Sequence, residues 1–479
     1  MNYSFVFYIL GWVLTLEAGF MMLPCVTSVI YREKTGFWFL AVAVVVAIGG
    51  LLLIRKKPKN PQFFTKEGFA VVGLSWIAMS LVGALPFTLS GEIPNYVDAV
   101  FETASGFTTT GASILLDVEA LSHTALIWRS FTHWIGGMGV FIFLLAVLPM
   151  AGGYNMNLMR AESPGPSVGK LVPKVKESAK ILYIIYFSIT ITEIVLLIIA
   201  RMPVFDAICI GFGTAGTGGF GVRGDSCASY NAVCQWIITV FMALFGINFN
   251  FYYFILRKKF KDAFSIEEVR WYVALILLST AFITFNVWGT YSTAEETVRT
   301  AAFQVSSIVT TTGFGSTDFN LWPTFSKTIL IVLMLTGACA GSTGGGLKIS
   351  RFIIWWKSIK NQLETFVHPR SVNAVEMDGK TIDKDTVRSV SVYMVVFLLV
   401  YVISVFLLSL DKFDLVTNFT AVLASVNNIG PGLGEVGPCG SFAGFNYFSK
   451  IVLIFDMLAG RLELYPILLL LAPGVWKKH

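Results

Sequence analysis

The stretch GFGTAGTGGFG, residues 211–221, raises the first question about this chain, because its first six residues match G-x-G-x-x-G, the pattern of a dinucleotide-binding turn. That turn needs a strand before the glycines, a helix that opens on the third glycine, and an acidic residue about 20 positions further on. Here a short apolar segment leads into the glycines and a polar loop follows them. The match therefore does not predict a nucleotide site, and the glycines need another explanation.

Three other places in the chain have the same organisation, an apolar segment followed by a glycine-rich knot. The four segments and knots are Val97–Phe107 with TTTGAS from Thr108, Val204–Thr214 with GTGGFG from Gly216, Val298–Ile308 with TTTGFGS from Thr310, and Val416–Val426 with NNIGPG from Asn427. Alignment on one glycine of each knot uses Gly111, Gly218, Gly313 and Gly430. Asp98, Asp206 and Asn418 then lie 13, 12 and 12 residues upstream, where they could cap a short helix.

The composition places these repeats in a membrane. The chain is 55% hydrophobic and 13% charged, with a mean hydropathy of +0.72, which is not the composition of a soluble domain. A helix needs about 20 apolar residues to cross the ~30 Å hydrocarbon layer, and we expect about ten such helices. The runs are Tyr3–Ile30, which we interpret as a retained helix and not a cleaved signal, Gly36–Ile54, Gly68–Leu89, Thr124–Leu148, Ile181–Ala200, Cys234–Leu256, Trp271–Trp288, Ile329–Trp356, Val390–Leu410 and Ile451–Leu471.

Basic residues predict the orientation, because Lys and Arg are enriched in short cytoplasmic loops. One side holds Arg55, Lys56, Lys57, Lys59, Lys66, Arg160, Lys170, Lys174, Lys176, Lys180, Arg257, Lys258, Lys259, Lys261, Arg270, Lys357, Lys360, Arg370, Lys380, Lys384, Arg388, Lys477 and Lys478; the other side holds only Arg32, Lys34, Arg201, Arg223, Arg299 and Lys412. Both chain ends are thus predicted to be cytoplasmic. The net charge of +6 is explained by basic loops beside anionic membrane lipid and requires no nucleic acid.

The predicted fold is an all-α polytopic membrane protein in which four pseudo-repeats of helix, pore half-helix, filter loop and helix surround one pore. Two extra transmembrane helices occupy residues 1–60. The repeats occupy residues 61–155, 156–262, 263–375 and 376–479, and the second helix of the third repeat is broken.

This arrangement predicts ion conduction. A half-helix of ~11 residues spans about half of the bilayer core, and its carbonyl end favours a cation at the membrane centre. Irregular backbone is tolerated at that depth only where it lines a wet cavity, and four such segments can form a ring of carbonyl oxygens that replaces the hydration shell of K⁺. The predicted filter residues are Thr109, Thr110, Gly111, Thr217, Gly218, Gly219, Thr311, Thr312, Gly313, Asn428, Ile429 and Gly430.

Several motifs resemble the TrkH/KtrB/HKT superfamily of potassium transporters over essentially the whole chain. They are TTTGAS at 108–113, WRSFTHWIGGMGV at 128–140, TTTGFGSTDFN at 310–320, GACAGSTGGGLKISR at 337–351, SVNNIGPGLG at 425–434 and AGRLELYPILLL at 459–470. The two extra N-terminal helices favour a TrkH-like layout. The resemblance implies a bacterial inner-membrane homodimer with one pore per subunit, gated by a cytosolic ring of nucleotide-binding regulatory subunits like TrkA. A serine at the first filter glycine goes with Na⁺ transport in some plant members, so Gly111 favours K⁺.

Two features lie below the predicted filter. The run 337–346 places five glycines inside an apolar helix, and each costs about 1 kcal/mol relative to alanine. The resemblance implies that Gly337, Gly341, Gly344, Gly345, Gly346 and Lys348 form an intramembrane gating loop; tight small-residue packing between helices is the alternative, and a phosphate-binding loop is excluded by the residues around Lys348. The resemblance makes Arg461 an electrostatic barrier that contacts this loop, and the alternative is a structural pair with Glu463 or Asp456.

The remaining candidates are weaker. Arg129 is predicted to be structural, with a side chain that could reach the membrane interface, and Glu193 is assigned to helix packing. Cys227 and Cys439 both fall on the outer side, where an external disulfide stays open. No motif supports catalysis or a bound cofactor. The predicted function is therefore a K⁺-selective, channel-like uptake protein with K⁺ as the transported ion, and a symporter coupled to Na⁺ or H⁺ is the alternative.

Overall fold

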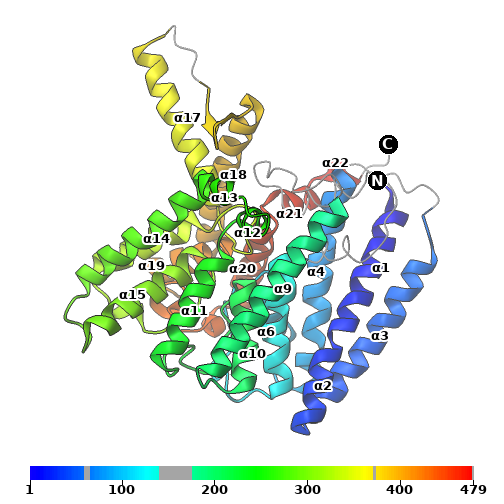
Figure 1. Ribbon diagram of the computed structural model, residues 1–479. Coiled ribbons are helices and arrows are strands. Elements are labelled where there is room, and N and C mark those ends of the chain that lie inside the picture. Colours follow the sequence, from blue (N-terminus) through cyan, green and yellow to red (C-terminus); the bar gives the residue numbers. More distant parts are fainter. Residues whose placement is uncertain (59–64, 140–174, 370–373, 477–479) are drawn as a thin grey trace.

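The computed structural model describes residues 1–58, 65–139, 175–369 and 374–476, and these are mostly helical (Figure 1). A two-stranded hairpin of β1 (Glu376–Met377) and β2 (Lys380–Thr381) supplies the strands in this part of the chain. The helices are α1 (Tyr3–Phe20), α2 (Met22–Tyr31), α3 (Gly36–Arg55), α4 (Thr65–Ser90), α5 (Tyr96–Phe107), α6 (His123–Met138), α9 (Val175–Ile199), α10 (Val204–Gly216), α11 (Ala232–Phe245), α12 (Phe249–Leu256), α13 (Phe260–Ser265), α14 (Glu267–Asn286), α15 (Ala294–Val309), α16 (Thr324–Thr336), α17 (Ile349–Val367), α18 (Lys384–Leu408), α19 (Leu415–Val426), α20 (Tyr447–Arg461), α21 (Tyr465–Leu470) and α22 (Pro473–Trp476), with short 3₁₀ turns at Phe319–Leu321, Gly434–Val436 and Phe442–Gly444.

The fold class is confirmed as an all-α polytopic membrane protein. In the described residues, six helical spans are long and apolar enough to cross a membrane, at Tyr3–Tyr31, Gly36–Arg55, Lys66–Ser90, Lys180–Ile199, Glu267–Asn286 and Lys384–Leu408. These helices also carry much of the exposed apolar surface, such as Val45 of α3 and Phe406 of α18. Apolar side chains that would be unfavourable in water are suited to contact with lipid tails.

Two further predicted spans are not continuous helices, which corrects two expectations. The run Cys234–Leu256 is divided into α11 and α12, which meet at an angle of 91°, and Ile451–Leu471 is divided after Arg461. Both breaks have distinctive local geometry. A side chain on Gly246 would collide with the Tyr272 hydroxyl, and Glu463 and Leu464 adopt positive φ angles of 55° and 66°. The break between α16 and α17 was predicted.

Four short helices, α5, α10, α15 and α19, are the predicted half-helices, and their N-termini differ from expectation. The side chains of Asn95, Thr293 and Asp414 cap α5, α15 and α19, and α10 follows Pro203. The prediction that Asp98, Asp206 and Asn418 cap these helices is therefore wrong, because all three lie inside their helices. Asp98 pairs with Lys450 at 2.6 Å and Asp206 with Arg223 at 3.1 Å instead.

The four half-helices form a closed circle through their neighbours. Helix α6 packs on α10, α11 on α15, α16 on α19, and α20 on α5. The residues of all four half-helices are largely buried, while α3 and α18 are largely exposed. The hydrophobic core therefore lies around the half-helices, which form the interior of the protein.

Both chain ends lie at the same end of the bundle, beyond which α17 and the hairpin project (Figure 1). The Tyr3 hydroxyl donates a hydrogen bond of 2.8 Å to the carbonyl of Trp476 and ties the ends together. Some sequence-based expectations lie outside the described residues, namely the end of the run Thr124–Leu148, the boundary at 155 and 156, and the basic residues Lys59, Arg160, Lys170, Lys174, Arg370, Lys477 and Lys478.

Candidate functional site

All four half-helices end with the same backbone motif. At the end of α5, the N–H of Thr109 donates to the carbonyl of Gly106 at 3.0 Å and the N–H of Thr110 donates to Ser105 at 2.8 Å. The same pair of bonds, to carbonyls three and five residues back, recurs at distances of 2.8–3.2 Å at Thr217 and Gly218, Thr311 and Thr312, and Asn428 and Ile429. This is the Schellman arrangement, which turns the chain out of a helix.

The residue at the centre of each motif is strained. Thr109, Thr217, Thr311 and Asn428 have φ angles of 56°, 55°, 61° and 54°, in the left-handed region that costs L-residues roughly 1–2 kcal/mol. Glycine usually occupies this position, and threonine is unfavourable there because its side chain is branched at Cβ. All four residues are fully buried. Strain of this kind, held in place by the surrounding structure, is typical of functional sites.

Two residues further on, each segment has a second positive φ, which is always at glycine. The angles are 80° at Gly111, 78° at Gly219, 84° at Gly313 and 95° at Gly430. Gly219, not Gly218, therefore corresponds to the other three glycines, and the sequence alignment on Gly218 is wrong by one residue. Two adjacent glycines made the register ambiguous in the sequence, and only the backbone angles distinguish them.

The four glycines bring the segments into a closed ring. A Cβ atom on Gly111 would lie less than 3.0 Å from the carbonyl oxygen of Gly218, one on Gly219 from that of Thr312, one on Gly313 from that of Ile429, and one on Gly430 from that of Thr110. Each glycine thus faces the carbonyl of the middle residue of the next segment, and the fourth segment faces the first. All twelve predicted filter residues lie in this ring.

The carbonyl oxygens of the ring are not used to hold the fold together. Within the described part of the chain, no N–H or O–H group donates a hydrogen bond to the carbonyl of any of the twelve residues. Side chains behind the ring bond to one another instead: Thr108 to Thr110 at 2.8 Å, Thr310 to Thr312 at 2.7 Å, and Asn428 to Thr110 at 2.9 Å. Because buried carbonyls are nearly always satisfied in native proteins, these acceptors are suited to a cation.

The predicted gating loop lies directly against this ring. The N–H of Gly345 donates to the Thr311 hydroxyl at 2.6 Å, and a Cβ on Gly344 would lie 2.9 Å from the carbonyl oxygen of Thr310. Gly337, Gly341 and Gly346 have positive φ, and the buried Lys348 donates to the carbonyl of Gly344. The glycines therefore form a folded loop between α16 and α17, not a smooth packing surface of one helix.

Glu268 holds both ends of this loop, and the sequence analysis missed it. Its carboxylate is 2% exposed and accepts the N–H of Ala340 at 2.6 Å and that of Ser350 at 3.2 Å. The loop also bonds to the junction of α11 and α12, where the N–H of Cys339 donates to Gly246 at 3.1 Å and the N–H of Phe249 donates to Gly341 at 2.9 Å. The only sequence signal was an acid at the start of an apolar span.

Arg461 contacts the same loop and is not paired with either acid considered from the sequence. It donates to the carbonyl of Thr343 in the loop at 2.9 Å and to the carbonyls of Gly136 and Gly137 at the end of α6, the latter at 2.9 Å. Glu463 pairs with Arg351, and Asp456 accepts from Ser404 at 2.7 Å. Arg461 is also the last residue of α20, at the break in the predicted span Ile451–Leu471.

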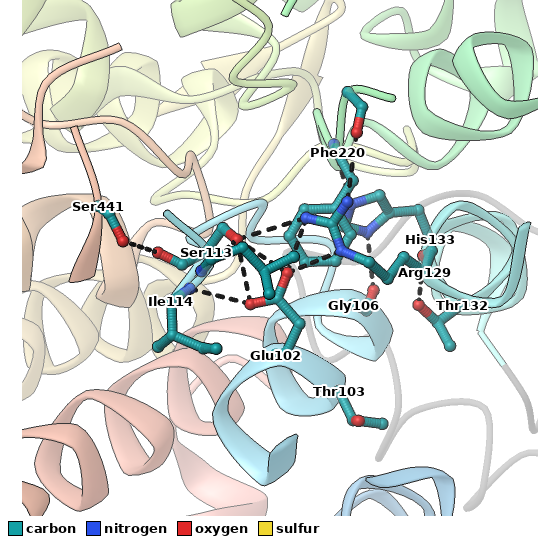
Figure 2. A network of polar contacts seen from close by, with 12 residues as sticks. Glu102, Thr103, Gly106, Ser113, Ile114, Arg129, Thr132, His133, Phe220 and Ser441 are labelled. Atoms are coloured by element: carbon teal, nitrogen blue, oxygen red, sulfur yellow. Dashed lines mark hydrogen bonds and ion pairs between the residues drawn. The ribbon is translucent and has the colours of Figure 1, made fainter. Parts of the chain in front are cut away.

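Arg129 is buried, so the expectation that it reaches the membrane interface is wrong. Its side chain is 2% exposed and pairs with Glu102 of α5 at 2.7 Å (Figure 2). His133 also belongs to this network. Sequence reasoning missed both Glu102 and His133, although Glu102 lies in the first half-helix and His133 lies in the same motif as Arg129. Glu193 is fully buried in α9, beside Thr214 of α10.

The other candidates give no further site. All six cysteines are free thiols, with Cys227 buried and Cys439 exposed. The external disulfide that the sequence left open is therefore not present between them. In the residues that the structure describes, no group of three or more His, Cys, Asp or Glu side chains could hold a metal ion.

The fold and this ring define a membrane protein of the cation-transporting class, and comparisons with known proteins give its family. A family model described as TrkH, cation transport protein, matches residues 37–478, so the chain belongs to the TrkH family, whose members are membrane transport proteins and not enzymes. It is 35% identical to the Trk system potassium uptake protein TrkH of Salmonella typhimurium and 34% identical to that of Escherichia coli K12, over 100% of each chain. It is 32% identical to TrkG of E. coli K12, over 98% of this chain and 97% of that one.

A solved structure agrees with these relatives. The crystal structure of the potassium transporter TrkH from Vibrio parahaemolyticus matches with a TM-score of 0.89 and 31% identity, and the match covers 100% of both chains.

Proposed function

We propose that this chain is a K⁺-selective, channel-like uptake protein in which ions pass a filter of backbone carbonyls. The ring of buried carbonyls without protein donors, formed by the twelve residues from Thr109 to Gly430, carries the proposal. The carbonyl ends of α5, α10, α15 and α19 meet at the ring, and their dipoles favour a cation there. The TrkH relatives are named as potassium uptake proteins, and all four ring positions keep glycine.

The loop from Gly337 to Lys348 is the proposed gate of this pore. It lies against the third and fourth segments of the ring, and Arg461 bonds to its Thr343 carbonyl. Arg461 and Lys348 place positive charge below the ring, which opposes the passage of K⁺ until the loop moves. Gating requires two arrangements of the loop with different stability, and its short hydrogen-bonded contacts to separate helices suit such a switch.

Regulation and assembly complete the proposal. The relatives belong to a Trk system, and we infer that cytosolic nucleotide-binding subunits, a ring like that of TrkA, control the loop of a homodimeric transporter. The membrane is the bacterial inner membrane, with both ends cytoplasmic. Helix α17, which carries Arg351, Lys357 and Lys360 against one acid, Glu364, projects from the bundle at that end (Figure 1) and supports this side as the regulatory one.

Flux measurements on the purified chain in liposomes test the function. We expect K⁺ flux that exceeds Na⁺ flux and follows the K⁺ gradient and membrane potential, which contributes ~2.3 kcal/mol per 100 mV. The matched control is G313V, which places a branched side chain against the carbonyl of Ile429 and should abolish flux. Flux that requires an added Na⁺ or H⁺ gradient would instead support the alternative, a coupled symporter.

A further inference from the structure

A buried polar network lies behind the first and second segments of the ring (Figure 2). Its centre is the ion pair of Glu102 in α5 and Arg129 in α6, with Nε and Nη2 of Arg129 at 2.8 and 2.7 Å from Oε1 of Glu102. Both side chains are at most 2% exposed. A buried ion pair is a weak source of net stability, because desolvation offsets its attraction, so a role in specificity must be argued from what it holds.

The carboxylate of Glu102 holds the chain just beyond the first filter segment. It accepts the Ser113 hydroxyl at 2.9 Å and the N–H of Ile114 at 3.0 Å. The carbonyl of Ser113 in turn accepts the N–H of Phe442, which follows the fourth segment, at 2.9 Å. The carboxylate therefore fixes the backbone that follows the first filter segment. Through Ser113, it also fixes the distance between this backbone and the chain that follows the fourth segment.

Arg129 and His133 hold the second segment from the other side. Nη1 of Arg129 donates to the carbonyl of Gly221 at 3.2 Å, and its guanidinium lies 4.0 Å from the ring centre of Phe220. The His133 ring lies 4.2 Å from the same aromatic ring. Phe220, directly after the filter glycine Gly219, is thus held between two side chains of α6.

The hydrogen bonds of His133 also fix its protonation state. Nδ1 lies 2.8 Å from the carbonyl of Gly106, which can only accept, so Nδ1 carries the proton. Nε2 accepts the N–H of Phe220 at 3.2 Å and is therefore unprotonated. One neutral imidazole consequently joins the carbonyl end of the first half-helix to the backbone of the second segment, and a Cβ on Gly218 would collide with it.

The network belongs to one seam of the ring. The residues that correspond to Glu102, nine positions before the ring glycine, are Ile210, Gln304 and Ala421. In the fourth repeat, Gly460 of α20 lies against the carbonyl of Val426 as Gly136 of α6 lies against that of Phe107, so the residue that corresponds to His133 is Met457. None of these can form an ionised pair or an imidazole bridge. The four contacts between adjacent filter segments are therefore stabilised by different side chains. Among these positions, only those beside the first and second segments hold an ion pair.

We propose that Glu102, Arg129 and His133 are positioning residues for ion selectivity, which set the spacing of the first and second filter segments; this rests on the proposed carbonyl filter. A carbonyl ring discriminates K⁺ from Na⁺ only while its oxygens keep their positions and number around the ion. Loss of the network lets Gly218, which faces Gly111 across this seam, move relative to the first segment.

The test measures selectivity and ion-specific stability separately, in the full-length protein. The variants are R129K, E102Q and H133N, with R223Q as the control, because Arg223 forms a more exposed arginine–carboxylate pair with Asp206 of α10. We expect the K⁺/Na⁺ flux ratio in liposomes to fall about fivefold in each of the three variants, a typical size for coupling through a side-chain network, and to stay unchanged in R223Q. H133N keeps an N–H for Gly106 and loses only the bond to Phe220, so it remains testable if the charge variants do not fold.

The second measurement requires no transport. We expect K⁺ to raise the melting temperature of the wild-type protein in detergent more than Na⁺ does, and this difference to shrink in the three variants. Loss of stability in both salts with an unchanged difference and an unchanged flux ratio would overturn the positioning role and leave a purely structural one. Wild-type protein that shows neither selective flux nor K⁺-specific stabilisation would overturn the proposed function itself.

Discussion

At the residue scale, Gly111 shows how tightly the ring is specified. Its φ of 80° disfavours any side chain, and a Cβ atom would meet the carbonyl oxygen of Gly218. We expect G111S to lower the K⁺/Na⁺ flux ratio, because this oxygen must move to make room for the serine. The control is G91S, since Gly91 has a φ of 82° but open space around it. A flux ratio that falls equally in both variants would show that backbone strain, not ring geometry, is responsible.

Arg461 is the second test at this scale. For an illustrative separation of ~10 Å and an effective dielectric constant of ~20, Coulomb's law gives a repulsion of about 1.7 kcal/mol between a guanidinium and a monovalent cation. We therefore expect R461A to raise K⁺ flux more than tenfold, since about 1.4 kcal/mol is a factor of ten. R461K should stay near the wild-type value because it retains the charge, and the exposed Arg270 provides the control R270A. Wild-type flux in R461A would exclude the barrier.

At the element scale, the loop between α16 and α17 depends on Glu268. The carboxylate accepts N–H groups from both ends of the loop, so its removal leaves buried donors unsatisfied, at a cost of about 1–3 kcal/mol. We expect E268A to increase K⁺ flux in the absence of regulatory subunits, because the closed position of the loop loses this support. The neighbouring Glu267 pairs with Lys357 at 2.7 Å outside the loop, so E267A should leave the flux unchanged.

Glu33 connects the loop between α2 and α3 to the start of α6, and its contribution to the stability of the fold depends on pH. Burial alone would raise the pKa of Glu33, but hydrogen bonds from Thr124 and His123 outweigh it and lower the pKa. A lowered pKa in the folded state stabilises the protein above the unfolded pKa of about 4.3, and this contribution is lost as the pH falls through the folded pKa.

We therefore expect E33Q to melt at a lower temperature than the wild-type protein at pH 7, by the equivalent of about 1 kcal/mol, the usual value of a helix cap. The difference should shrink as the pH falls below about 4.3. Glu435, an exposed acid, provides the control E435Q. A difference between wild type and E33Q that stays constant as the pH falls from 7 to well below about 4.3 would show that the charge of Glu33 does not stabilise the fold.

The elements also show what the sequence could and could not predict. Hydropathy predicted the spans and the four half-helices, because lipid imposes a length and a composition on each. It could not predict the bend between α11 and α12, where the backbone bonds to the distant residues Cys339 and Gly341, or the break after Arg461, where Glu463 and Leu464 adopt positive φ angles without being glycine. The network of Glu102 and His133 was missed for the same reason: its residues are distant in sequence and become partners only when α5, α6 and the second filter segment pack together.

At the scale of the whole molecule, the positions of the chain ends and of the half-helices suggest an orientation in the membrane. The half-helices enter from the end of the bundle opposite to the chain termini, and α17 and the hairpin project from the terminal end (Figure 1). If the basic end is cytoplasmic, the loops after the filter segments face outwards. Cys439 is exposed in one of these loops, Cys25 is half-buried within α2, and Cys209, Cys227, Cys234 and Cys339 are buried.

A membrane-impermeant maleimide applied to intact cells should therefore label the wild-type chain and fail to label C439S. In the C439S background, a second cysteine introduced by K380C, at the exposed hairpin, should be labelled only after the membrane is permeabilised. The pKa of Cys439 is raised, by partial burial and by the nearby Asp318 and Asp225, so its thiolate fraction is small at neutral pH and labelling should accelerate as the pH rises to 8.5. Labelling of K380C from outside would reverse the orientation, and with it the side on which regulatory subunits can reach the gating loop.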